Sequence, residues 1–144
     1  MRATMLLADH AQVAEGKLYI NGGGWNVIGP APTPFAIALY VEVPWDQTNT
    51  KHSLLLELLD ADGHPVVPPE SEDAIRIEFP PLEVGRPAGV KPGTPLGVSY
   101  AVNFGPLPLE PNGHYVWQLT IDGQQSDEWR LTFSTRPVTG AATG

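Results

Sequence analysis

The chain has 144 residues, of which 42% are hydrophobic and 17% charged; this suits one globular domain and excludes a disordered chain. The formal net charge of −8, with no basic cluster to offset it, argues against a nucleic acid or an anionic membrane as partner. No apolar run approaches the ~20 residues of a membrane span, and the absence of cysteine excludes disulfides, thiol catalysis and cysteine metal sites.

The first residues, MRATMLLADH, contain an apolar run that Asp9 and His10 end too early for a signal-peptide core. No small-residue cleavage site follows the run. We therefore expect a cytoplasmic protein whose mature chain starts at or near Met1.

Apolar and other residues alternate along most of the chain, as half-buried strands require. Residues 35–43, FAIALYVEV, put Phe35, Ile37 and Leu39 on one face, and residues 74–79, 114–122 and 125–134 alternate in the same way. Asp-Gly pairs at 62–63 and 122–123 are strong hairpin signals, and no segment keeps a 3.6-residue repeat. We expect about nine strands, near residues 4–12, 17–28, 35–43, 52–59, 64–67, 74–79, 97–104, 114–122 and 125–134.

The predicted fold class is therefore all-β, a two-sheet antiparallel β-sandwich, because hairpin turns join most neighbouring strands and no crossover helix is available. One domain is expected over residues 1–137, followed by a flexible C-terminal tail at 138–144. The stretch at 80–96 holds five prolines and three glycines, so it is predicted to cross irregularly between the sheets or along an edge.

Three consecutive glycines interrupt residues 18–29, LYINGGGWNVIG. A phosphate loop needs a helix after the glycines, but strand-forming residues follow here, then three prolines, and the P-loop lysine is missing. The preferred interpretation is a glycine-kinked strand that passes between sheets. The alternative is a ligand or partner that approaches the bare backbone, with Trp25 as its contact.

The histidines do not form a recognisable catalytic or metal-binding spacing. His10 and Asp9 would point to opposite faces of one strand, whereas His52, His64 and His114 adjoin turns and are predicted to be solvated. A metal site assembled from separate strands stays open at this point.

Other motifs also favour structural interpretations. DADGHP resembles the first half of a calcium loop, but Gly63 comes too early and no glutamate closes the loop, so a hairpin turn is preferred. Ser99 lacks the second glycine and the helix of a nucleophile elbow. We accordingly predict no catalytic residue, no metal and no cofactor.

The segment VPWDQTNTKH at 43–52 offers a candidate contact surface. Trp45 either caps one end of the core or forms a flat platform beside neighbouring polar groups, suited to sugar or protein recognition. Trp117 lies in the strongest inward pattern and is expected in the core. The candidate partner or ligand contacts are Trp25, Trp45, Asp46, Gln47, Asn49 and, in the 80–96 loop, Arg86.

Two resemblances add to these expectations. In LPLEPNGHYVWQLTIDG, Leu109, Gly113 and Tyr115 resemble the tyrosine corner of immunoglobulin-like and fibronectin-like sandwiches, which implies an immunoglobulin-like architecture. MLLADHAQVAEGKLYINGGGW, EVPWDQTN, LELLDADGHPV and WRLTFSTRP resemble a domain-of-unknown-function family of small bacterial proteins, mostly actinobacterial. That resemblance implies a compact cytoplasmic protein and assigns no functional residue.

The function hypothesis that follows is a non-catalytic β-sandwich that acts by protein–protein association, either with another protein or, as a homodimer joined through a sheet face or edge, with itself. A small-ligand module, for example for a carbohydrate, is the alternative and needs at least two of the tryptophan rings in one concavity. A hydrolase or metal enzyme is the third hypothesis and needs a histidine that meets carboxylates in space.

Overall fold

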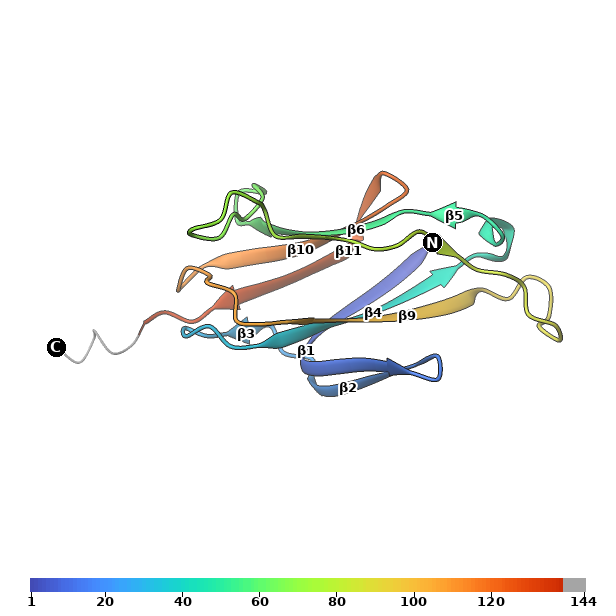
Figure 1. Cartoon of the computed structure of the whole chain (residues 1–144), viewed down its shortest axis with the longest axis horizontal. Coiled ribbons are helices and arrows are strands. Elements are labelled where there is room, and N and C mark those ends of the chain that lie inside the picture. Colours follow the sequence, from blue (N-terminus) through green and yellow to red (C-terminus); the bar gives the residue numbers. More distant parts are fainter. Residues whose placement is uncertain (139–144) are drawn as a thin grey trace.

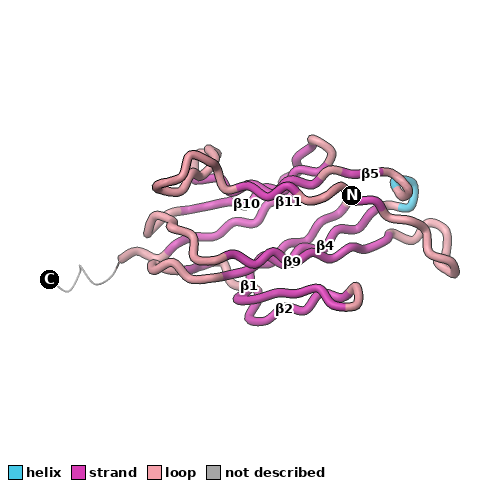
Figure 2. Tube along the Cα trace, in the orientation of Figure 1, coloured by secondary structure: helices cyan, strands magenta, loops and turns pink. Residues whose placement is uncertain are grey.

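The computed structural model describes residues 1–138 and confirms an all-β protein (Figures 1 and 2). Helical structure within these residues is limited to the three-residue 3-10 turn η1, so no helix there could cross a membrane. Of the tail predicted at 138–144, all but Val138 lies outside the described residues. The elements are β1 (Arg2–Ala14), β2 (Lys17–Gly23), β3 (Val27–Ile28), β4 (Phe35–Val43), η1 (Trp45–Gln47), β5 (Lys51–His52), β6 (Leu54–Asp60), β7 (Arg76–Glu78), β8 (Leu82–Glu83), β9 (Leu96–Phe104), β10 (His114–Ile121) and β11 (Gln124–Thr135).

Two main sheets face each other in a sandwich, as predicted (Figure 1). The first has the strand order β2-β1-β4-β9 and is antiparallel throughout. The second has the order β3-β11-β10-β6-β7, and β5 and β8 form a separate pair. The expectation of purely antiparallel pairing is wrong at one place, where β3 runs parallel to β11. This contact needs no crossover helix because it pairs only two residues from each strand, far apart in the sequence.

The core between the sheets follows the alternation seen in the sequence. Phe35, Ile37 and Leu39 are buried from β4, and they meet Leu56 and Trp117 from the other sheet in one hydrophobic cluster. Phe104 stacks on both Phe35 and Trp117, with ring centroids 5.0 Å apart in each case. Trp117 is therefore a core residue, as predicted.

The glycine stretch is the bend that was preferred over a phosphate loop. β2 ends at Gly23 in the first sheet, and β3 begins at Val27 in the second, so the chain crosses between sheets here. Gly22 and Gly24 have φ values of +61° and +94°, which glycine adopts most readily. A side chain at Gly22 would also collide with the carboxylate of Asp9.

The hairpin formed by β1 and β2 folds back over the outer face of its own sheet. In Figure 1 it lies beneath β4 and β9, on the side away from β6, β10 and β11. Ala11 packs there against Ala36 and Ala38, whose small side chains allow the close approach. The side chain of Asn103 fixes the layer, since its amide accepts from the Ala11 N–H at 3.3 Å and donates to the Ala11 C=O at 2.8 Å.

Three predicted strand assignments need correction. Residues 64–67 are not a strand: Pro65 makes an isolated bridge to Leu59, and the Val66 C=O accepts from the Ile75 N–H at 2.9 Å. Pro65 and Pro68 have no N–H to extend the pairing. The strand expected at 74–79 is confined to 76–78, and the one expected at 17–28 is divided by the glycine bend. The 80–96 segment crosses between the sheets as predicted and contributes β8 on the way.

The predicted tyrosine corner is present. The hydroxyl of Tyr115, near the start of β10, accepts a hydrogen bond of 2.9 Å from the Glu110 N–H. The ring lies against Gly113, where an added Cβ would come within 3.0 Å of it. This contact explains why a glycine precedes the strand.

Candidate functional site

Most of the predicted contact residues gather at one end of the sandwich, where β4 runs into η1. The Arg86 guanidinium lies 4.3 Å from the centre of the Trp45 ring. Its Nε donates to Thr48 Oγ1 and its Nη2 donates to the Trp45 C=O, each at 2.7 Å. Two hydrogen bonds and a cation–π contact therefore hold this arginine in one orientation.

The same end brings in the loop residues that were predicted with Trp45. Asn49 has a φ of +58° and donates its N–H to the Val84 C=O at 2.7 Å, which links this loop to the segment carrying Arg86. Asp46 and Gln47 are exposed. Beside Arg86 lies an open concavity of about 470 Å³, lined mainly by apolar residues that include Leu82, Val84, Pro87 and Val98.

His52, which was predicted to be solvated, is buried at this end. Its Nδ1 lies 2.7 Å from the Asp122 carboxylate and its Nε2 lies 2.7 Å from the Gln47 C=O. Both partners are acceptors, so the ring satisfies them by donating from both nitrogens as an imidazolium. The prediction failed because local sequence shows only the turn beside His52, whereas Asp122 lies 70 residues away.

The two pKa values of this pair move in opposite directions. Burial alone lowers the pKa of His52, but the hydrogen bonds to the Gln47 C=O and the Asp122 carboxylate outweigh it and raise the pKa above 6.5. Burial alone raises the pKa of Asp122, but the hydrogen bonds from His52 and from the Ser53 N–H lower it overall. Each partner therefore favours the charged form of the other.

Trp25 is not part of this end. It makes a T-shaped contact with Phe35, with the ring centroids 6.1 Å apart. Phe35 is the first residue of β4, whereas Trp45 comes after the last. The structure therefore separates the two rings by the length of β4. Trp25 lines a different cavity, of about 360 Å³, together with Asp9, Thr33 and Arg136.

The cavity at Trp25 was not predicted as a unit. Arg136 holds its position there by donating from Nη1 to the Gly29 C=O at 3.0 Å. Asp9 comes from β1, at the position where the glycine bend leaves room for its carboxylate. The Nε1 of Trp25 is buried with no hydrogen-bond partner among the described residues. Sequence spacing gives no signal for this grouping, because its residues come from both ends of the chain.

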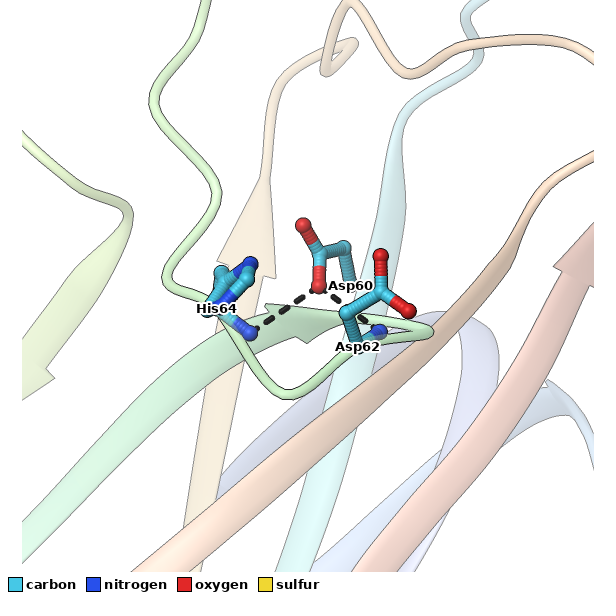
Figure 3. Close-up of side chains that lie close together, drawn as sticks. All are labelled: Asp60, Asp62 and His64. Carbon is cyan, nitrogen blue, oxygen red and sulfur yellow. Dashed lines mark hydrogen bonds between the residues drawn. The ribbon is translucent and has the colours of Figure 1, made fainter.

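Asp60, Asp62 and His64 lie close together in the turn after β6 (Figure 3). Asp60 Oδ1 accepts the backbone N–H groups of Asp62 and His64, each at 2.9 Å. This is an Asx-type turn closed by the first aspartate, so the arrangement follows from turn chemistry alone. The turn expected in DADGHP is therefore present.

The outer strand of the β1–β2 hairpin is a further candidate surface. β2 is the terminal strand of its sheet, and Tyr19 and Ile20 are 46% and 38% exposed on it. The edge position of β2 was not predictable from the sequence, because alternation along a strand does not give the order of strands in a sheet.

Comparison with known proteins gives one match. Searches of curated proteins and of solved structures found no similar protein. A model for a family of unknown function, DUF6941, matches residues 3–134. This range includes the hairpin, the Trp45 end and the residues that line the Trp25 cavity, except Arg136. The chain therefore belongs to the DUF6941 family of unknown function.

Proposed function

We propose that the protein is a non-catalytic β-sandwich that works by associating with protein, first of all with a second copy of itself. The observation that carries this proposal is the free edge of β2, with Tyr19 and Ile20 exposed on it. Unpaired backbone N–H and C=O groups along such an edge accept a strand from another chain. Closed two-fold dimers are the commonest symmetric outcome.

Sedimentation equilibrium between low and high micromolar concentration tests the association. We expect the average mass to rise toward twice that of the monomer. A monomer throughout this range would contradict the proposal.

The proposed lack of catalysis is supported by the way the polar groups are used. Both ring nitrogens of His52 are already engaged, so this buried ring has no free site for a substrate proton. His114 and Ser134 are opposite each other on β10 and β11, with Nδ1 and Oγ 3.0 Å apart, which is an ordinary cross-strand pair. A fluorophosphonate probe should therefore leave Ser134 unlabelled, and labelling that the Ser134→Ala variant loses would show an activated nucleophile.

The contacts predicted at the Trp45 end are part of the same proposal. Trp and Arg dominate the energetics of many protein interfaces, and here Arg86 is held in place before any partner binds. Replacement of Arg86 by alanine should weaken association if this end contributes to it. An unchanged dimer in that variant would remove the Trp45 end from the contact surface.

We also infer an immunoglobulin-like connection of the strands. In support, β1, β4 and β9 have the order of strands A, B and E, while β7, β6, β10 and β11 have the order C′, C, F and G. The tyrosine corner falls at the start of the strand that corresponds to F. A crystal structure with a different strand order would refute this. The bacterial and cytoplasmic setting is a proposal from the family resemblance alone, checked by fractionation of the native host.

A carbohydrate-binding function is the second candidate, and the cavity at Trp25 favours it, although this cavity holds one tryptophan ring and not the two that the sequence hypothesis required. The cavity combines part of an aromatic ring with a carboxylate, Asp9, and a guanidinium, Arg136, which are the side-chain types that bind sugar rings and hydroxyls. Its volume of about 360 Å³ suits a small ligand. Titration with a panel of mono- and oligosaccharides should change the tryptophan emission of the wild type and of Trp45→Phe, but not of Trp25→Phe. No change in the wild type would rule this candidate out.

A further inference from the structure

The backbone hydrogen bonds of the β1–β2 hairpin determine which groups of β2 face outward. Glu15 and Gly16, with φ values of +53° and +72°, form a two-residue turn flanked by the pair Ala14–Lys17. Such a flanking pair is hydrogen-bonded, and bonded and non-bonded pairs then alternate along the ladder. The N–H and C=O groups of Leu18 and Ile20 therefore point away from β1, toward the free edge.

This edge lacks the features that usually protect strand edges. β2 contains no proline, and its one charged residue is Lys17 at its start. Edge protection normally relies on proline, on charges at the centre of the strand or on a very short strand. By contrast, the edge strand β7 has only three residues, two of which, Arg76 and Glu78, are charged.

A two-fold axis perpendicular to the sheet allows only a few registers between two β2 strands. Antiparallel partners must share a face, so the axis has to pass beside a residue that pairs with its own copy. With Tyr19 at the axis, Leu18 of each copy lies opposite Ile20 of the other. The outward backbone groups of both residues then form two hydrogen-bonded pairs, and the two Tyr19 rings become close neighbours on the exposed face.

The charge on β2 also favours this antiparallel register. Lys17, at one end of the strand, is its one charged residue. Antiparallel pairing puts Lys17 opposite Asn21 of the second copy and keeps the two Lys17 ammonium groups at opposite ends of the paired strands. Parallel pairing would instead put the two Lys17 side chains together.

We propose that two copies of the chain join through β2 in antiparallel register, with Tyr19 at the two-fold axis and Lys17 of each copy opposite Asn21 of the other. The two four-stranded sheets then form one continuous eight-stranded sheet. This inference rests on the proposed self-association and specifies its interface.

Cysteine cross-linking tests the register, since the chain has no native cysteine. At the axis, non-bonded partners have Cα atoms about 4.5 Å apart, within the range of about 4.4–6.8 Å that a disulfide spans. Tyr19→Cys should therefore form a covalent dimer under mild oxidation. The matched control Asn21→Cys places the two sulfurs on residues about 14 Å apart and should stay uncross-linked.

The outcomes separate this interface from association in general. If the protein sediments as a dimer and Ile20→Cys cross-links, the proposed register is wrong. If Ser99→Cys cross-links instead, the dimer forms through the other outer strand, β9, and the proposed edge is wrong. Self-association stands in both cases. A dimer that cross-links at none of these positions also overturns the interface. A monomeric wild type overturns both proposals.

A further variant tests the edge without damage to the hairpin. Ile20→Pro removes an N–H that the β1–β2 ladder does not use, so the variant should keep its strand content by circular dichroism and lose the dimer. A variant that keeps both its strand content and the dimer would contradict the proposed interface.

Discussion

His52 and Asp122 join parts of the molecule that local sequence does not connect. The carboxylate of Asp122 accepts from His52 Nδ1 at 2.7 Å and from the Ser53 N–H at 3.0 Å. The turn after β10 is thereby attached to the short connection between β5 and β6. Through the Gln47 C=O the same imidazole also reaches η1, which carries Trp45.

The first prediction concerns the pH dependence of this pair. The raised pKa of His52 stabilises the fold fully below pH 6.5, and the stabilisation is lost as the pH rises through the folded-state pKa. The lowered pKa of Asp122 stabilises the fold above pH 3.8, and this is lost as the pH falls through its folded-state pKa.

Both contributions are therefore present at pH 5. Asp122→Asn should lower the free energy of unfolding by about 1 kcal/mol there, since solvent screens the half-exposed carboxylate, and by less at pH 9. Urea titrations at the two pH values measure the difference, with Asp62→Asn as control. An effect of equal size at both values would show that His52 carries no charge in this contact.

The second prediction concerns the tyrosine corner. Tyr115→Phe removes the acceptor of the Glu110 N–H and should lower the free energy of unfolding by about 1 kcal/mol. Tyr19→Phe removes an exposed hydroxyl and should change the free energy of unfolding of the monomer by less than about 0.5 kcal/mol. Chemical denaturation at low protein concentration compares the two variants, and an undiminished stability of Tyr115→Phe would mean that water replaces the lost bond.

At the scale of elements, the glycine bend decides how β1 and β2 relate to the two sheets. β1 pairs with β4 through its first half and with β2 through its second, and Ala8 has a partner in both. Beyond the bend, β3 joins the opposite sheet beside β11. The hairpin can lie across the outer face only because the backbone changes direction at Gly22 and Gly24.

The third prediction tests this bend. Gly22→Ala adds a Cβ in the left-handed region and against the Asp9 side chain, so it should destabilise the fold by about 2 kcal/mol. Asp9→Ala in the same chain should recover part of the loss by removing the collision. Gly105→Ala, with open space around its Cβ and no positive φ, is the control and should be close to neutral. Equal stability of the Gly22 and Gly105 variants, measured by thermal unfolding, would show that the bend does not require glycine at position 22.

At the scale of the whole molecule, net charge opposes dimerisation. Each copy carries a formal net charge of −8, so the two copies repel over long range. The one charged residue of β2 is Lys17, which the proposed register places opposite Asn21, so the strand pairing itself supplies no ion pair against this repulsion. The repulsion between the two net charges therefore dominates the dependence on salt.

The fourth prediction follows from this long-range repulsion between the two copies. The Debye length falls from about 30 Å at 0.01 M salt to about 8 Å at 0.15 M, which screens the long-range repulsion first. The dimer dissociation constant should therefore fall severalfold over this range of sodium chloride, as measured by sedimentation velocity. If the constant instead rises, local ion pairs hold the dimer together and the net charge has little influence.

The sequence by itself determined the all-β class, most of the strands, the identity of core residues such as Phe35 and Trp117, and the tyrosine corner. These follow from side-chain alternation and turn chemistry, which act over a few residues. It also named six candidate contact residues. The structure places five of them, Trp45, Asp46, Gln47, Asn49 and Arg86, at one end and Trp25 elsewhere. Whether they contact a partner stays a prediction.

Only the tertiary structure decided the strand order, the free edge of β2, the burial of His52 beside Asp122 and the separation of Trp25 from Trp45. Each of these depends on which distant segments become neighbours. A period of two says which face of a strand is buried but contains no information about the strand that lies beside it.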